Sequence, residues 1–273
     1  MFRKRRRRNS ILKLFRVTDM AYARAFNGIA FLGGVLDQIA HISGERPKTY
    51  GANYEKEWKT WEGFSNGSSK LPELAFADFF YPREGLLCVY ENSLVGFYKP
   101  PAVGSLSLTI SCPESLCSVQ QLLDLAKAVY PSFPFEYGYA HSLTDDFEPT
   151  SEIKFRRTFG GRSMKVGPAS STWLYHMVGI RHGFLRSVYP KNILNSSQTS
   201  NTIVANLQKE GVGQLEPFVA DLQLWSISDD QIPGALEVLS TSGSLIWDDK
   251  GRDIFLRRNE AREYHEAMFP KRA

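Results

Sequence analysis

The densest group of chemically capable side chains in this sequence lies in the segment TDDFEP. Asp145, Asp146 and Glu148 fall within four consecutive positions of it. Carboxylates at this spacing can coordinate a divalent cation or act as acid and base in catalysis, and they are also frequent in solvated turns. Thr144 and Pro149 flank the three carboxylates and favour a turn. We therefore predict an exposed acidic turn that faces a binding partner.

A second polar group lies in GIRHGFLRSVYPKNILN, residues 179–195. Much of this stretch consists of residues that make turns or cap helices, namely Gly183, Pro190, Asn195 and Ser196. Three polar side chains have no such role: Arg181, His182 and Arg186. We predict that these three form a structural or partner-facing cluster rather than a catalytic one.

No known catalytic pattern accompanies these groups. The hydrolase pattern GxSxG is absent, and His176 and His182 are six positions apart rather than the four that align two metal ligands on a helix. An enzyme nevertheless stays open as an alternative, since catalytic groups far apart in sequence can meet in space. Its polar cleft would combine four side chains: His141, Asp145, Asp146 and His182.

The cysteines argue against a metal site and against secretion. Cys88, Cys112 and Cys117 are an odd, sparse set for 273 residues, which indicates a reducing compartment such as the cytoplasm. Cys112 and Cys117 follow a CxxxxC spacing with no histidine nearby, which is not a zinc pattern. We predict neither a metal nor a cofactor.

The positive charge is concentrated at the N-terminus. Residues 1–16 hold eight basic residues and no acidic one, so the rest of the chain has 25 basic against 29 acidic residues and a formal net charge of −4. A basic groove for nucleic acid across the domain is therefore not supported, although a nucleic-acid-associated protein that uses this N-terminus stays an alternative. Lys13 and Arg16 interrupt ILKLFRV, which argues against a signal peptide. We interpret residues 1–19 as a basic, disordered segment, or as an over-extended start before a native chain that begins at Met20.

The remainder, residues 20–273, is predicted to form a single domain. With 42% hydrophobic residues the chain can bury a substantial core, and no linker-like composition divides it. The apolar stretch from Ala21 to Ala40 contains Arg24, Asn27 and Asp37, so it falls short of the roughly 20 apolar residues of a membrane span. We predict no span.

The elements that must position these side chains are mainly antiparallel strands. GSLSLTIS places Leu106, Leu108 and Ile110 on one face of a half-buried strand. The runs Leu86–Tyr90 and Leu94–Tyr98 precede it around a turn, which suggests a meander. Further strands are expected in Phe133–Leu143 and in FVADLQLWSI.

Helices are expected between these strands. Ser118 and Gln121 form a capping-box pattern ahead of an apolar helical stripe that Pro131 stops, and Ser228 with Gln231 repeats the pattern. SSQTSNTIVANLQKEG reads as one helix closed by Gly211, and Glu260 to Met268 as a terminal helix. The predicted fold class is α+β, with a mainly antiparallel sheet and helices packed on it.

Short motifs along residues 85–247 resemble bacterial toxin-immunity proteins, especially the type VI immunity family and related polymorphic-toxin immunity proteins. The matching pieces are a meander with an alternating strand, a helix before PSFPF, the strand motif Tyr137-Gly138-Tyr139-Ala140, Arg156-Arg157, Trp173-Leu174 and the stretch 179–195. The long basic N-terminus departs from that pattern.

The resemblance implies a non-enzymatic cytoplasmic protein that binds and neutralises a cognate toxin or effector. Acidic surfaces with aromatic anchors suit basic partners such as nuclease-type toxins. On this hypothesis the partner-binding residues are Asp145, Asp146, Glu148, Arg181, His182 and Arg186.

Overall fold

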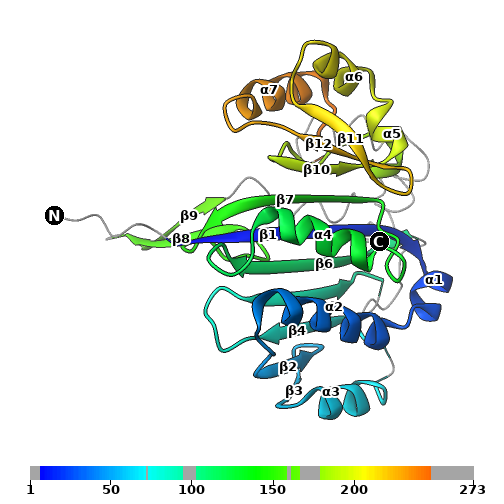
Figure 1. Ribbon diagram of the computed structural model, residues 1–273, viewed down its shortest axis with the longest axis vertical. Helices are drawn as coiled ribbons and strands as arrows, with labels where there is room; N and C mark the ends of the chain where they lie inside the picture. The colour runs from blue at the N-terminus through cyan, green and yellow to red at the C-terminus, as the bar shows by residue number, and fades with distance from the viewer. Residues whose placement is uncertain (1–6, 72, 95–102, 159–160, 167–178, 247–273) are drawn as a thin grey trace, which may run out of the picture.

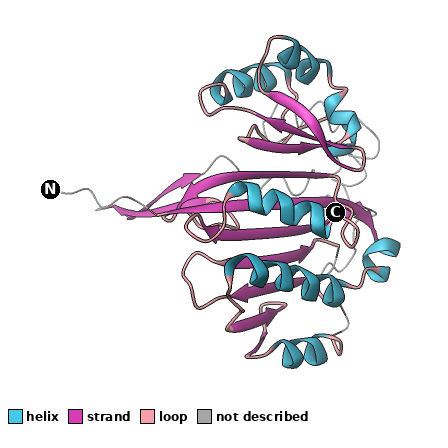
Figure 2. Cartoon of the chain, in the orientation of Figure 1, coloured by secondary structure: helices cyan, strands magenta, loops and turns pink. Residues whose placement is uncertain are grey.

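The computed structural model describes residues 7–71, 73–94, 103–158, 161–166 and 179–246. Within these residues the predicted α+β class is confirmed: helices pack on one large antiparallel sheet (Figure 2). Some predicted elements lie outside the described residues: most of the strand Leu94–Tyr98, the Trp173 segment and the helix from Glu260 to Met268.

The large sheet has ten described strands in the order β11-β12-β10-β7-β1-β6-β5-β4-β2-β3, and every neighbouring pair is antiparallel (Figure 1). Its strands are β1 (Arg8–Asp19), β2 (Thr49–Ala52), β3 (Lys56–Trp58), β4 (Phe76–Phe80), β5 (Leu87–Asn92), β6 (Val103–Pro113), β7 (Tyr137–Thr144), β10 (Lys191–Leu194), β11 (Gln214–Val219) and β12 (Leu222–Ser226). A separate hairpin is formed by β8 (Ile153–Thr158) and β9 (Gly161–Val166).

The described helices are α1 (Met20–Ala25), α2 (Gly28–Ser43), α3 (Trp61–Ser68), α4 (Val119–Val129), α5 (Ser196–Thr199), α6 (Thr202–Lys209) and α7 (Ile232–Ser242). Figure 1 shows α2 and α4 side by side over one face of the sheet, with α5, α6 and α7 grouped around β10, β11 and β12. No helix in the described part of the chain combines the length and apolarity of a membrane span.

The prediction that residues 1–19 are disordered, or precede the native fold, is wrong from Arg8 onward. Residues 8–19 form β1, which is hydrogen-bonded to β6 on one side and to β7 on the other. Removing β1 would leave the facing edges of β6 and β7 without backbone partners, and unpaired buried amides and carbonyls are costly. The domain therefore includes the N-terminal strand. Of the predicted meander, the strands β5 and β6 are confirmed and pair antiparallel, and β4, which pairs with β5, was not predicted.

Both faces of β1 are buried, and its alternating side chains divide the core in two. Leu12 and Leu14 pack into the cluster beneath α2 and α4, while Phe15 and Val17 join the cluster with α6 and α7. All four are at most 2% exposed. A strand covered on both faces is nearly continuously apolar, and ILKLFRV follows that pattern except at Lys13 and Arg16.

Local capping signals are confirmed where the structure is helical. Ser118 and Gln121 form the predicted capping box of α4, and Asn195 with Gln198 forms another at α5. Ser228 and Gln231 do not make one, because Gln231 is itself the N-cap of α7 and makes no side-chain capping bond.

Two predicted elements are divided in the structure. The single helix expected in SSQTSNTIVANLQKEG is two short helices, α5 and α6, because Asn201 caps a new start. The single strand expected in FVADLQLWSI is the end of β11 and all of β12, separated by a turn at Ala220, which has a φ of 51°.

Candidate functional site

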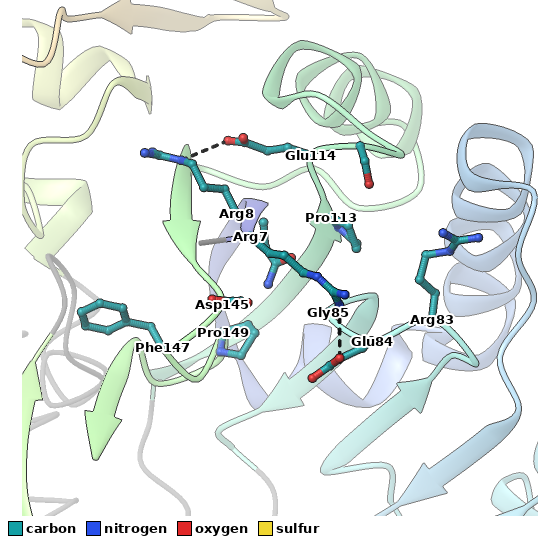
Figure 3. Close-up of a pocket in the computed structure, with 12 residues that line it drawn as sticks. Arg7, Arg8, Arg83, Glu84, Gly85, Pro113, Glu114, Asp145, Phe147 and Pro149 are labelled. Atoms are coloured by element: carbon teal, nitrogen blue, oxygen red, sulfur yellow. Dashed lines mark hydrogen bonds and ion pairs between the residues drawn. The ribbon is translucent and has the colours of Figure 1, made fainter. Parts of the chain in front are cut away.

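Four segments of the chain converge where β1 begins. Because β1 is antiparallel to both neighbours, β6 and β7 end beside its start: Asn9 pairs with Pro113, and Arg8 pairs with Thr144. The loop that leads into β5 reaches the same end, since β5 is antiparallel to β6. A hollow of about 580 Å³ lies among these segments, and we call it the end groove (Figure 3).

Charges of both signs line the end groove, and they are exposed. The lining includes three arginines and three carboxylates: Arg7, Arg8, Arg83, Glu84, Glu114 and Asp145. Apolar surface is supplied by Pro113, Phe147 and Pro149. Three arginines and three carboxylates make the lining of the groove formally neutral.

Two ion pairs organise these charges. Arg7 Nη1 lies 3.5 Å from Glu84 Oε2, and the two side chains are 77% and 92% exposed. Arg8 Nε lies 3.5 Å from Glu114 Oε1 and donates to Ser142 Oγ at 2.7 Å (Figure 3). Exposed pairs of this kind are each worth up to about 1 kcal/mol, so a partner's charges can replace them at small cost.

Gly85 fixes the shape of the groove near Asn9. Its φ is 86°, and a Cβ at this position would lie 2.7 Å from Asn9 Oδ1. Its carbonyl also accepts from Ser111 Oγ at 2.8 Å. A side chain there would strain the backbone and displace Asn9, so the close approach of these strands requires glycine.

The acidic segment is a turn, as predicted, and its three carboxylates have different surroundings. The Asp145 amide donates to the Arg7 carbonyl at 3.1 Å, which holds the turn against the groove and leaves the carboxylate exposed. Asp146 Oδ1 accepts from Thr144 Oγ1 at 2.5 Å.

Glu148 organises the second half of this loop. Its Oε1 accepts from the Thr150 amide at 2.9 Å, and its Oε2 accepts from Ser151. Burial alone would raise the pKa of Glu148, but these hydrogen bonds outweigh it and lower the pKa. Glu148 is therefore a loop-forming residue as well as an exposed one.

Beneath the loop lies a cluster of interior charges, which we call the buried cluster: Lys13, Tyr139, His141, Glu152 and Arg186. Lys13 Nζ lies 3.3 Å from Glu152 Oε1, and these side chains are 3% and 0% exposed. Glu152 adopts a φ of 54°, which costs about 1 kcal/mol or more for a residue other than glycine. The ion pair stabilises this backbone conformation because it holds the side chain against β1.

Tyr139 and His141 add hydrogen bonds to the cluster. Glu152 Oε1 lies 3.4 Å from both Tyr139 OH and His141 Nε2. Arg186 Nη1 donates to Tyr139 OH at 2.8 Å. The Tyr139 ring stacks on Tyr189 with centroids 3.8 Å apart, which positions the hydroxyl between Arg186 and Glu152.

Burial and charge act in opposite directions on the pKa of Glu152. Burial alone would raise it, but the Lys13 ammonium, followed by His141 and Arg186, lowers the pKa to about 2. Burial lowers the pKa of Lys13, an effect that Glu152 opposes and Arg186 reinforces. Glu152 is therefore a carboxylate across the physiological range.

Arg181 and His182 lie at the other end of β1. Arg181 Nη2 donates to the Val17 carbonyl at 2.9 Å. The guanidinium also forms a bidentate ion pair with Glu136, in which Nε donates to Oε2 at 2.7 Å and Nη2 to Oε1 at 2.6 Å. The Arg7 carbonyl accepts from the Asp145 amide, and Arg7 precedes Val17 by ten residues. Along an extended strand this is a separation of roughly 30 Å. His182 follows Arg181 and is half-buried.

The six predicted partner-binding residues therefore occupy three places. Asp145, Asp146 and Glu148 share the loop at the end groove, Arg181 and His182 lie at the opposite end of β1, and Arg186 is interior. Arg186 is 2% exposed, so it contributes to the buried cluster rather than to a surface. The alternative enzyme cleft is likewise not assembled, because His141 lies in the buried cluster and His182 beside Arg181.

The basic N-terminal arm is also divided by the fold. Lys13 is interior, and Arg16 donates to the Pro134 carbonyl and stacks over Tyr22, with 4.0 Å between Cζ and the ring centroid. Arg7 and Arg8 line the end groove. From Arg7 onward the basic residues thus form no flexible arm for nucleic acid.

Sequence reasoning missed Lys13, Glu152 and Glu84. A signal existed for Lys13, since a single lysine inside an otherwise apolar strand must find a buried partner. Strand order decides which residue is that partner. It also decides that Glu84, in the loop before β5, lies in the groove. Among the described residues no three histidine, cysteine, aspartate or glutamate side chains gather as metal ligands, and Cys88, Cys112 and Cys117 are buried free thiols.

No family model matches the sequence, and no curated protein matches it. Among solved structures the chain is similar to the Pseudomonas aeruginosa T6SS protein PA0821, with a TM-score of 0.48 and 9% identity. That alignment covers 85% of this chain and 73% of that chain.

Proposed function

We propose that this chain is an immunity-type protein, which binds and neutralises a cognate protein toxin, and that the end groove is its binding surface. The observation that carries the proposal is the end groove itself: an open hollow with three exposed arginines, three exposed carboxylates and an aromatic ring. Protein interfaces likewise combine charged residues with apolar and aromatic ones.

The exposed ion pairs suit the groove to a charged partner. Arg7 and Glu84 gain little from each other because both are largely in water. A partner that desolvates either residue and supplies the opposite charge gains more interaction free energy than is lost when the exposed pair separates. Complementary charges also speed association. Phe147 and Pro149 offer the apolar contact that such a complex needs at its centre.

The acidic turn is the part of the predicted site that this proposal retains. Asp145 lines the groove, and Asp146 and Glu148 shape the loop that presents it. The motif resemblance to toxin-immunity proteins supports the same function. Arg181 and His182 are too distant to share one compact contact with Asp145.

Co-expression tests the function directly. The chain is produced together with the protein encoded beside it, and growth and complex formation are measured. We expect growth to be restored and the two proteins to co-purify. Continued killing with no complex would reject the immunity function.

Charge reversal tests the surface separately. Asp145→Arg and Glu84→Arg, each in the end groove, are expected to weaken the complex at least tenfold, about 1.4 kcal/mol. Glu210→Arg is the matched control, because Glu210 is exposed at the end of α6 and away from the groove. If both groove variants bind like the control and still protect, the toxin binds elsewhere on this chain.

A further inference from the structure

A small polar cavity lies beside the buried cluster, between the sheet and the loop after β7. Its volume is about 160 Å³, and the described residues that line it include Lys13, Glu91, Ser107, Thr109, Thr150 and Arg186. They come from β1, β5 and β6, from the loop and from the segment before β10. Neither the end groove nor its proposed partner involves this cavity.

Lys13 brings an incompletely satisfied ammonium to the cavity. The ammonium has three N–H groups, and among the described residues it has two acceptors: the Thr150 carbonyl at 2.5 Å and Glu152 Oε1 at 3.3 Å. The residue is 2% exposed, so bulk water does not satisfy the third N–H. An acceptor inside the cavity is therefore favoured.

Thr109 faces Lys13 directly across the strand pair. The two residues are register partners in β1 and β6, which places their side chains on the same face of the sheet. The Thr109 hydroxyl lines the cavity and makes no hydrogen bond to a described residue. Lys13 and Thr109 thus both line the cavity, and each carries a hydrogen-bond donor.

Among the described residues, two cations, Lys13 and Arg186, and one carboxylate, Glu91, line the cavity. Glu152 pairs with Lys13 and is not among the described residues that line the cavity. Arg186 does line it and supplies a second cation. Glu91 is the carboxylate on the opposite wall, where it accepts from Ser107 Oγ at 3.3 Å. Burial raises the pKa of Glu91, with Lys13 opposing and Glu148 reinforcing that shift, so Glu91 takes up a proton more readily than an exposed glutamate.

We propose that this cavity binds a small oxyanion, of the size of a carboxylate or a sulfate, between Lys13, Thr109 and Arg186. One oxygen accepts from the third Lys13 N–H and another from the Thr109 hydroxyl, and the guanidinium supplies the second positive charge. The volume equals that of about five liquid water molecules, so the anion enters without displacing a side chain.

Binding is measured by calorimetry and by amide chemical shifts, with sodium sulfate and sodium acetate as probes at constant ionic strength. Glycerol is the neutral probe of similar size. We expect saturable binding of the anions with shifts at Thr109 and Thr150, and no saturable binding of glycerol. Equal binding of glycerol would overturn an anion site, and so would unchanged shifts with every probe, which would mean that water alone fills the cavity.

Thr109→Val removes one donor and preserves the shape of the side chain. We expect it to weaken sulfate binding about tenfold. Thr49→Val is the matched control, because Thr49 is a buried strand threonine on β2, outside the cavity. Sulfate binding that is equal in wild type, Thr109→Val and Thr49→Val would refute the site. This variant is preferred over Lys13→Met, which leaves Glu152 unpaired and threatens folding.

Glu91→Gln supplies an independent readout. Sulfate keeps its charge between pH 5 and 8, so any pH dependence of its binding in this range reports protein groups. Protonation of Glu91 removes a negative charge from the cavity wall, so wild-type affinity should rise as the pH falls, and Glu91→Gln should bind more tightly and with a flatter profile. A wild-type affinity that falls with decreasing pH would contradict the arrangement.

Discussion

Strand β1 carries two ion pairs of similar chemistry in opposite surroundings. Arg7, just before its first residue, pairs with Glu84 at 3.5 Å in water, and Lys13, at its centre, pairs with Glu152 at 3.3 Å in the interior. The two N–O distances are nearly equal, but the exposure of the side chains is not. Arg7 and Glu84 are 77% and 92% exposed, whereas Lys13 and Glu152 are 3% and 0% exposed. Solvent, rather than separation, therefore decides what each pair contributes to stability.

The two pairs also differ in what their loss would leave behind. A surface arginine without its partner is hydrated by water, whereas a buried lysine without its partner is an uncompensated charge in a medium of low dielectric constant. The end groove is consequently free to evolve with a partner, while the buried cluster constrains the fold.

The largest expected effect is the loss of the buried carboxylate. Glu152→Ala should lower the free energy of unfolding by about 3–5 kcal/mol, because Lys13 is left buried without its counter-charge. Urea denaturation measures this change, with Glu84→Ala as the exposed counterpart. A loss below about 1 kcal/mol would mean that water reaches Lys13 and that the two pairs are alike.

Acid should reveal the same pair through its pKa. The pKa of Glu152 is lowered to about 2 from an ordinary value of 4.5, so its contribution is fully present above pH 4.5 and is lost as the pH falls toward 2. The shift corresponds to about 3 kcal/mol. Denaturation midpoints of wild type and Glu152→Gln should therefore converge between pH 4.5 and 2, and a constant difference across this window would exclude the lowered pKa.

An intermediate effect is expected at the far end of β1. Arg181 pairs with Glu136 through two hydrogen bonds, and their side chains are 45% and 22% exposed. Arg181→Lys keeps the charge but loses the paired geometry, which should cost about 1 kcal/mol. Thermal unfolding tests this value, and a cost as large as that of Glu152→Ala would show that burial is not the deciding factor.

The smallest effect is expected in the end groove. Arg7→Gln should change stability by less than about 0.5 kcal/mol at physiological ionic strength, and 1 M salt should remove even that. The same substitution should nevertheless weaken toxin binding if the groove is the interface. A large loss of stability would instead make Arg7 a structural residue.

Much of the local structure of this protein follows from short-range patterns. The alternating residues of β6, the capping box of α4 and the positive φ of Gly183 were all predictable, because each depends on neighbours within a few positions. The α+β class followed from the same patterns. The acidic turn was also recognisable from its residue types.

The order of the strands was not predictable in this way. Insertion of β1 between β6 and β7 pairs residues that are between 84 (Asp19 to Val103) and 136 (Arg8 to Thr144) positions apart. The residue pattern within ILKLFRV does not indicate which strands flank it. The basic residues before and within this run suggested a solvated tail. Burial of both faces of the strand converts the same residues into the centre of the sheet.

Helix α4, several turns and the alternation of β6 follow from the local sequence, because these features depend on sterics and periodicity within a few residues. The completed fold, by contrast, is needed to bring Lys13 to Glu152, to place Arg186 in the interior and to bring Arg7, Glu84 and Asp145 to one groove. These contacts are set by strand pairing between distant segments, and the worth of each charge depends on how much water the completed fold leaves around it.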